Sequence, residues 1–242
     1  MPGELVTHVA LITGAGRGIG RATALRLARA GCDVGLVGRT QTDLDAVVAV
    51  AASCGVRAVA LAADIADDMQ LRSLPERAAA GLGAVSILIN NACNAPPRTP
   101  LAKMRIADLH GTLATCLRAP MVLSRLLLPE MLSRRHGAII NVASSTHRDR
   151  RPGEAGYVAA KAGLVAFSRA LFAEVRNSGV KVAAICPGYV DTGFVPPNRR
   201  VDRSKFLRPE DVAEAIFQVL TNPAHCCPTE VIVEPQLDPE QP

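Results

Sequence analysis

The sequence predicts an α/β fold in which one doubly wound parallel sheet carries helices on both faces. Short apolar runs without polar alternation recur along the chain, and a helical stretch follows most of them. Aromatic residues make up only 3% of the 242 residues and Trp is absent, so aliphatic side chains must build the core. Because no linker, repeat or low-complexity segment divides the chain, residues 1–242 are expected to form one domain.

The first half of the chain supplies four expected strands and three expected helices. Residues 9–13 are apolar and end in a glycine cluster, and residues 21–30 are rich in Ala, Leu and Arg. A second apolar run covers 33–38, and Thr40 can cap the helix that follows it at 41–54. Gly31 and Gly55 close these two helices. The apolar runs 56–62 and 85–89 then flank a helix at 69–80.

The second half continues the alternation after a Pro-rich loop at 91–100. A long helix is expected at 109–134, although Pro120 and Pro129 lie within it. Strands at 137–142 and 180–185 flank a helix at 155–177, and residues 187–205 are irregular and basic. Pro209 opens a helix to about residue 220, and a last strand covers 230–233. Ligands of such sheets bind outside the carboxyl ends of the strands.

Charge is unevenly distributed along the chain. Residues 147–208 carry 12 basic and 5 acidic side chains, whereas residues 209–242 carry 7 acidic and no basic ones. The basic segment suits a phosphorylated cofactor or an acidic carrier, or it is simply a solvated surface. The scarcity of aromatics argues against nucleic acid, and no apolar run approaches the ~20 residues of a membrane span. We therefore expect neither a nucleic acid nor a membrane as partner.

The seven cysteines predict reduced thiols in the cytoplasm, because the N-terminus has no basic run followed by an apolar stretch. His225, Cys226 and Cys227 lack the spacing of a zinc site and are flanked by prolines. We expect them to be loop residues, and we expect no metal.

A glycine-rich turn, Thr-Gly-Ala-Gly-Arg-Gly-Ile-Gly, joins the first strand to the first helix. Glycines let the backbone approach a pyrophosphate, and the helix N-terminus offers free N–H groups. The alternative is a tight turn without a ligand.

The second strand ends in Gly38-Arg39-Thr40, with no carboxylate for a ribose 2′-hydroxyl. Arg39 and Arg17 would suit a 2′-phosphate, which favours NADP(H), unless Arg39 is simply exposed.

Tyr157 and Lys161 are spaced to lie on one face of a helix. A neighbouring ammonium favours the phenolate form of a tyrosine, whose pKa is ordinarily about 10, so the pair can transfer a proton near neutral pH. Ser144 closes the fifth strand and can hydrogen-bond a substrate carbonyl, with Ser145 as the alternative. The competing interpretation of Tyr157 and Lys161 is an exposed pair without function.

These motifs together resemble the short-chain dehydrogenase/reductase family over residues 5 to about 234. The resemblance implies a Rossmann-type fold with Ser144, Tyr157 and Lys161 as catalytic residues. It implies cofactor contacts from the glycine turn, the ends of strands and a Pro-Gly segment: Gly14, Arg17, Gly18, Ile19, Gly20, Arg39, Asp64, Ile65, Asn91, Ala92, Tyr157, Lys161, Pro187, Gly188, Val190 and Thr192.

The family implies an NADP-dependent oxidoreductase that acts on CH–OH groups. The chain is similar to 3-oxoacyl-carrier-protein reductases, so a carbonyl reductase is favoured, with its substrate free or linked to a carrier or CoA. The same residues would serve a dehydrogenase of a sugar, a polyol or another secondary alcohol. The family also implies a homodimer or homotetramer. Basic residues bordering the expected substrate mouth would suit an acidic substrate or be a solvated loop: Arg148, Arg150, Arg151, Arg199, Arg200, Arg203 and Lys205.

Two positions depart from the family pattern. Cys93 follows Asn90-Asn91-Ala92 where the family has Gly, and Cys116 stands where the family's catalytic tetrad has Asn. A side chain at position 93 would crowd the floor of the cofactor cleft or fix its loop differently. Both changes support an alternative function, that of a weakly catalytic dinucleotide-binding regulatory protein.

Overall fold

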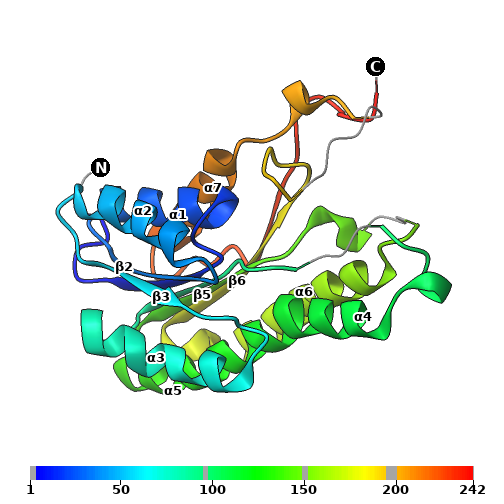
Figure 1. Ribbon diagram of the computed structural model, residues 1–242. Coiled ribbons are helices and arrows are strands. Elements are labelled where there is room, and N and C mark those ends of the chain that lie inside the picture. Colours follow the sequence, from blue (N-terminus) through cyan, green and yellow to red (C-terminus); the bar gives the residue numbers. More distant parts are fainter. Residues whose placement is uncertain (1–3, 95–97, 149–151, 195–200, 242) are drawn as a thin grey trace.

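The computed structural model describes residues 4–94, 98–148, 152–194 and 201–241, and it confirms the layered α/β architecture (Figure 1). Its strands form one parallel seven-stranded sheet in the order β3-β2-β1-β4-β5-β6-β7. The strand bounds are β1 (Val9–Thr13), β2 (Asp33–Gly38), β3 (Ala58–Ala62), β4 (Ile87–Asn90), β5 (Gly137–Val142), β6 (Val180–Pro187) and β7 (Glu230–Val233).

Helices cover both faces of this sheet. Three of them pack on one face: α1 (Gly18–Arg29), α2 (Gln41–Ala52) and α7 (Pro209–Thr221) (Figure 1). The opposite face carries α3 (Asp68–Leu82), α4 (Ile106–Leu113), α5 (Ala119–Arg134) and α6 (Ala155–Val175). Because both faces are covered, neighbouring residues of one strand enter different apolar layers: Leu11 faces one cluster and Ile12 the other.

The prediction of one continuous α-helix over residues 109–134 is wrong. The helix begins at Ile106 and passes through a π-helical turn at Ala114–Arg118 before α5. Pro120 has no N–H to donate to the carbonyl of Cys116, so the regular hydrogen-bond ladder is interrupted at that carbonyl. A sequence pattern of apolar residues continues through such a turn and does not reveal it.

The helical stretch Ile106–Arg134 is also long and apolar enough to cross a membrane by length and composition alone, with a mean hydropathy of 1.2. The expectation from the sequence concerned only uninterrupted apolar runs, and a search for such runs overlooks this stretch because polar residues are scattered along it. Its inner side chains pack in the core beneath the sheet, among them Leu123, Leu127 and Met131.

The prediction that all seven cysteines are reduced is wrong for two of them. Cys93 and Cys116 form a disulfide, and the other five are free thiols: Cys32, Cys54, Cys186, Cys226 and Cys227. The last two lie in the loop between α7 and β7, as expected. Within the described ranges, no group of three His, Cys, Asp or Glu side chains is placed to hold a metal ion.

Candidate active site

The glycine turn between β1 and α1 lies directly on the segment that follows β4. Gly14 and Gly18 have φ angles of +68° and +54°, which side chains other than glycine rarely adopt. A Cβ atom on Gly14 would lie 2.8 Å from the Asn91 amide nitrogen and 2.9 Å from the Cα atom of Ala92. Glycine is thus required for this close approach, and the open N-terminus of α1 beside it, which has no acidic residue in its first turn, fits the pyrophosphate of a dinucleotide.

The floor of this turn is held by a set of hydrogen bonds. The Thr13 hydroxyl accepts hydrogen bonds from the backbone N–H groups of Asn91 and Ala92, both at 3.0 Å. The Asn91 side chain donates to the carbonyls of Thr13 (2.9 Å) and Gly14 (3.3 Å). The ends of β1 and β4 are therefore fixed to each other at the predicted cofactor cleft.

The predicted adenosine side of the cleft is a small cavity of about 280 Å³ beside the end of β2. It is lined by Arg39, Ala62, Ala63, Asp64 and Gln70. The Asp64 carboxylate accepts a hydrogen bond from the Ala66 N–H at 2.9 Å. Arg39 is exposed at the cavity and Arg17 is exposed at the start of α1, so either guanidinium is available to a phosphate. The side chain of Ile65, by contrast, is buried in the core.

A buried chain of polar groups fixes α6 against the sheet. The Asn90 side chain donates to Asn141 at 2.8 Å, and the Asn141 amide donates to the Ser168 hydroxyl at 2.8 Å. Ser168 in turn donates to the carbonyl of Leu164 at 2.7 Å. Because unpaired polar groups are costly to bury, this chain sets the position of the helix that carries Tyr157 and Lys161.

The predicted catalytic groups gather at the carboxyl end of β5. Ser144 is buried there, and its hydroxyl oxygen accepts hydrogen bonds from the Thr146 N–H (3.2 Å) and hydroxyl (2.9 Å). Tyr157 is half-buried on the first turn of α6, with its ring centroid 5.8 Å from the Lys161 Nζ atom. The centroid of the Phe194 ring lies 6.0 Å from that of Tyr157.

Lys161 is almost completely enclosed, with 3% of its surface exposed. Its ammonium donates to the Val142 carbonyl at 2.7 Å. Burial lowers the pKa of Lys161 from 10.5 to about 8, and the nearby Cys186 acts in the opposite direction. A cation that gives up its proton this readily, beside a tyrosine ring, is suited to proton transfer near neutral pH.

The predicted Pro-Gly segment closes the cleft from the far side. Pro187 ends β6, and the Gly188 N–H donates to the Val233 carbonyl at 2.8 Å. Val190 is buried, and Thr192 faces the glycine turn, with its methyl carbon 3.1 Å from where a Cβ atom on Gly18 would be. The structure therefore brings the glycine turn together with the segment after β4 and with the Pro-Gly segment.

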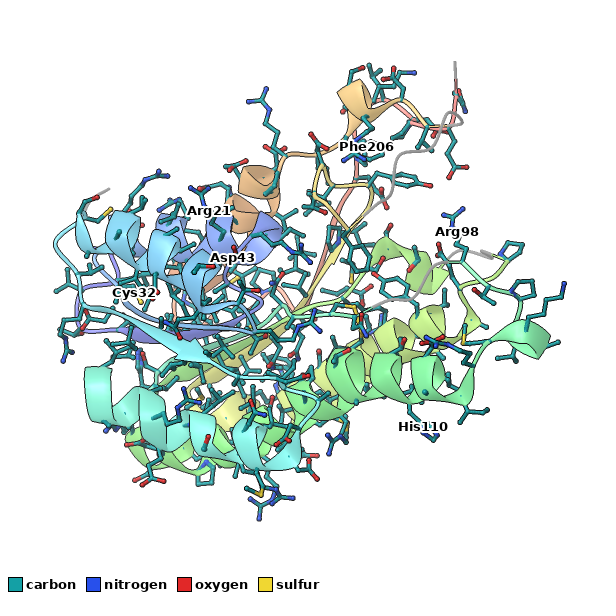
Figure 2. The ribbon with its side chains drawn as sticks, in the orientation of Figure 1. Arg21, Cys32, Asp43, Arg98, His110 and Phe206 are labelled. Carbon is teal, nitrogen blue, oxygen red and sulfur yellow. A yellow bond between two sulfur atoms is a disulfide. The ribbon has the colours of Figure 1, made fainter. Side chains whose placement is uncertain are left out.

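A larger cavity of about 630 Å³ is lined by Ser145, the neighbour of Ser144, at the end of the molecule where Figure 2 shows Arg98 and Phe206. It is lined by Arg98, Ser145, Pro152, Tyr189, Glu234, Pro235, Gln236, Asp238, Pro239 and Glu240. Among the described lining residues, the three carboxylates outnumber the single cation, Arg98, which is paired with Glu154. The Tyr189 hydroxyl donates to the Glu240 carboxylate at 2.5 Å. The C-terminal segment thus forms one wall of the cavity and brings three carboxylates to it.

The predicted basic border of the substrate mouth is only partly visible. Arg150, Arg151, Arg199 and Arg200 lie outside the described residues, as do the side chains of His147 and Arg148. Arg203 pairs with Asp191 at 2.6 Å, and the Lys205 ammonium donates to the Gln241 carbonyl at 2.8 Å. These two cations therefore hold neighbouring parts of the chain together.

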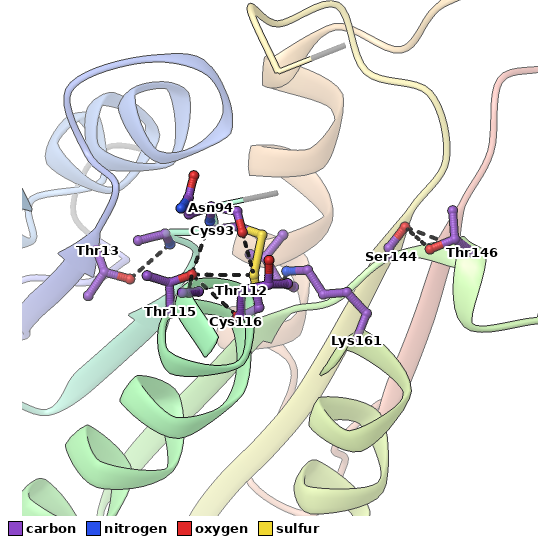
Figure 3. The surroundings of a disulfide bond; sticks show 12 residues. Thr13, Cys93, Asn94, Thr112, Thr115, Cys116, Ser144, Thr146 and Lys161 are labelled. Carbon is purple, nitrogen blue, oxygen red and sulfur yellow. Dashed lines mark hydrogen bonds between the residues drawn. A yellow bond between two sulfur atoms is a disulfide. The ribbon is translucent and has the colours of Figure 1, made fainter. Parts of the chain in front are cut away.

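Two features of the site were not foreseen from the sequence. The first is the set of carboxylates that the C-terminal segment brings to the cavity, since no motif marks them. The second is the bond between Cys93 and Cys116, which lies beside Thr13 and Lys161 in Figure 3. Both cysteines were visible as departures from the family pattern, but a separation of 23 residues does not establish that they pair.

Comparison with known proteins shows which family the sequence matches and which individual proteins it is similar to. The family model described as short chain dehydrogenase matches residues 8–202. A 3-oxoacyl-[acyl-carrier-protein] reductase of Synechocystis sp. is 33% identical, over 91% of this chain and 92% of that protein. A cis-4-hydroxycyclohexanecarboxylate dehydrogenase of Sinomonas cyclohexanicum is 34% identical, over 86% of this chain and 87% of that protein.

A solved structure has the same fold along nearly the whole chain. It is a metagenomic short-chain oxidoreductase in complex with NADP, 29% identical in sequence, with a TM-score of 0.84. The similarity covers 97% of this chain and 100% of the other.

Proposed function

This chain belongs to the short-chain dehydrogenase family, and from that premise we propose that it interconverts a ketone and a secondary alcohol with NADP(H). The observation that carries the proposal is the pair of Tyr157 and buried Lys161 on α6, next to Ser144 at the end of β5. When bound, NADP(H) would supply the hydride-transfer chemistry. The Ser144 hydroxyl orients the substrate oxygen, Tyr157 transfers the proton to it, and Lys161 lowers the pKa of the phenol.

The residues around the cleft support NADP(H) as the cofactor. A guanidinium at Arg39 lines the cavity at the end of β2, where a carboxylate would favour an unphosphorylated ribose. The Gly14 turn packs too closely on Asn91 and Ala92 to carry a side chain, and the N-terminus of α1 beside it offers N–H groups to a pyrophosphate with no acidic residue in its first turn. The related solved structure was determined with NADP.

The first candidate substrate is a 3-oxoacyl compound, free or linked to a carrier protein or CoA. Relatives named 3-oxoacyl-[acyl-carrier-protein] reductase support it, because they match most of the chain at 33–35% identity. Reduction of the 3-keto group needs only the hydride, the Tyr157 proton and a hydroxyl that holds the ketone oxygen.

The second candidate is a neutral, hydroxyl-rich alcohol such as a sugar or polyol, or a ring alcohol. The acidic wall of the larger cavity favours it, because Glu234, Asp238 and Glu240 can accept hydrogen bonds from hydroxyls but repel anions. The dehydrogenase of Sinomonas cyclohexanicum, whose name describes a hydroxycyclohexanecarboxylate, is a relative that supports a ring alcohol; because that compound carries a carboxylate, it does not support a neutral substrate.

We further propose that the protein acts as a homo-oligomer in the cytoplasm. The exposed apolar side chains Leu101, Ile106 and Met121, near or on the α4–α5 stretch, support self-association. The five free thiols support a reducing compartment.

The decisive experiment measures oxidation of NADPH and NADH with an acetoacetyl thioester and small ketones, and reduction of NADP⁺ with polyols and ring alcohols. Turnover with NADPH is expected, and Tyr157→Phe should lower kcat by about 10²- to 10⁴-fold while NADPH still binds, because only the proton donor is lost. Tyr189→Phe is the matched variant, since it removes the chain's other phenol; it should change KM and leave kcat.

A preference for NADH would overturn the assignment of NADP(H). Binding of NADPH without turnover of any substrate would favour the regulatory alternative instead.

A further inference from the structure

We propose that Cys93 and Cys116 form a reversible thiol–disulfide site whose oxidation state controls how tightly the protein binds NADPH. The proposal rests on NADPH being the cofactor. It begins with position: Cys93 lies in the loop after β4, Cys116 lies in the π-helical turn, and their Cα atoms are 5.0 Å apart. That separation is within the range that a disulfide spans without moving the backbone.

The pair lies next to the floor of the cofactor cleft. Cys93 directly follows Ala92, whose N–H donates to Thr13 and whose Cα atom closely underlies Gly14. On the C-terminal side of Cys93, the Asn94 N–H donates to the hydroxyl of Thr115, the residue before Cys116, at 3.1 Å. The disulfide therefore joins the π-helical turn to a segment that the glycine turn uses as its base (Figure 3).

Reduction must change this arrangement, because two thiols cannot approach each other as closely as two bonded sulfur atoms. Cys116 has 1% of its surface exposed and packs tightly, so it has little room to move. Cys93 is only half-buried, so its side of the pair must shift. Any shift of Cys93 is passed to Ala92 and hence to the base of the turn that receives the pyrophosphate.

The surroundings favour a reversible site over a permanent structural bond. The chain keeps five free thiols, and Cys54, Cys226 and Cys227 among them are not buried. Such a composition suits a reducing compartment, where disulfides are usually transient. The difference in exposure also indicates which cysteine reacts first. Cys93 is accessible to a small reagent in solution, whereas Cys116 is accessible only to Cys93.

The exchange balances with a disulfide of the glutathione class as oxidant. The Cys93 thiolate attacks one sulfur of oxidised glutathione, forms a mixed disulfide and releases one glutathione thiolate. The Cys116 thiolate then attacks the Cys93 sulfur, which forms the protein disulfide and releases the second glutathione. Two protein thiols are oxidised, one glutathione disulfide is reduced, and the two protons pass to the released thiolates.

The test measures free thiols and NADPH affinity on the same samples, after equilibration with reduced or oxidised glutathione. Two fewer thiols should react in the oxidised protein after denaturation. The Kd for NADPH, measured by fluorescence without any substrate, should be about tenfold higher in the reduced protein, a coupling of ordinary size. Cys93→Ser should bind like the reduced protein in both buffers, and the exposed-site control Cys54→Ser should respond like the wild type.

Equal thiol counts in the two buffers would overturn the proposal, because the pair then does not exchange. A fall in thiol count with an unchanged Kd would also overturn it, because oxidation then does not reach the cleft. If NADPH binds in neither state, the proposed function fails together with this inference, whereas redox-independent binding leaves the proposed function intact.

Discussion

Lys161 illustrates how a single residue can lower stability in return for function. Its ammonium is enclosed with one carbonyl partner, and burial lowers its pKa from 10.5 to about 8. That difference corresponds to roughly 3 kcal/mol of lost stability while the lysine is charged in both the folded and the unfolded chain. The site therefore makes the fold less stable than an apolar side chain at position 161 would.

We expect Lys161→Met to abolish turnover and to raise the free energy of unfolding at pH 7 by about 1–2 kcal/mol, because the lost hydrogen bond to Val142 offsets about 1 kcal/mol. Since the folded pKa is depressed, the wild type regains stability between pH 8 and 10.5, where only the unfolded chain stays protonated. The advantage of the variant should therefore shrink over that range.

Urea unfolding of both proteins at pH 7 and pH 10 measures this, with the exposed-site variant Lys103→Met as a control that should change little. A lower free energy of unfolding for Lys161→Met than for the wild type at pH 7 would contradict the prediction. It would show that interactions of the buried ammonium outweigh the cost of burying its charge.

The positions of the expected catalytic residues could be predicted from the sequence, while their roles stay a prediction. Tyr157, Lys161 and Ser144 follow from spacing on a helix and at a strand end, and the structure gathers them at one place. The partner of Lys161 could not be predicted, because a backbone carbonyl such as that of Val142 leaves no trace in the residue types. The pairing of Cys93 with Cys116 depends equally on how the π-helical turn lies against the loop.

The turn between β1 and α1 is the element on which cofactor binding depends most directly. We expect Gly14→Ala to weaken NADPH binding at least about tenfold, which corresponds to about 1.4 kcal/mol, because its Cβ atom would press on Asn91 and Ala92. Gly55→Ala is the matched variant: Gly55 also has a positive φ, +83°, but open space around it.

Both variants should lose roughly 1–2 kcal/mol of stability from backbone strain, so fluorescence titration with NADPH separates the two effects. Equal loss of NADPH affinity in both variants would mean that strain, and not the close approach at Gly14, accounts for the change.

The bounds of an element could be predicted where a local sequence signal, such as an apolar run, determines them without the influence of distant residues. β1, β2, β5 and β7 have the bounds that their apolar runs predict. The stretch 109–134 does not have the predicted bounds. Its regular hydrogen bonding is interrupted because Pro120 lacks the backbone N–H that would donate to the carbonyl of Cys116, four residues earlier. The apolar periodicity continues across these four residues and therefore predicts one unbroken helix.

At the scale of the whole molecule, the acidic C-terminal segment meets the basic middle of the chain. The Glu230 carboxylate pairs with Arg169 at 2.5 Å, and Lys205 holds the Gln241 carbonyl. The sequence shows that the two segments have opposite charge, but their meeting follows only from the position of β7 at the sheet edge.

Deletion of residues 234–242 should leave the Kd for NADPH unchanged and raise KM for the carbonyl or alcohol substrate. The loss of about one or two hydrogen bonds, at about 1 kcal/mol each, corresponds to about a five- to thirtyfold rise in KM. Steady-state kinetics beside a binding titration measures both quantities. An unchanged KM would show that the cavity wall formed by Glu234, Asp238 and Glu240 does not face the substrate.

The same segment determines how the protein is best attached to tags, dyes and sensor surfaces. Glu240 lines the large cavity, so anything fused at the carboxyl end begins beside the opening through which a substrate would enter. The amino end lies on a different side of the molecule (Figure 1). Immobilisation through the amino end keeps the opening accessible, whereas a carboxyl-terminal tag would itself compete for the space that the assay is meant to probe.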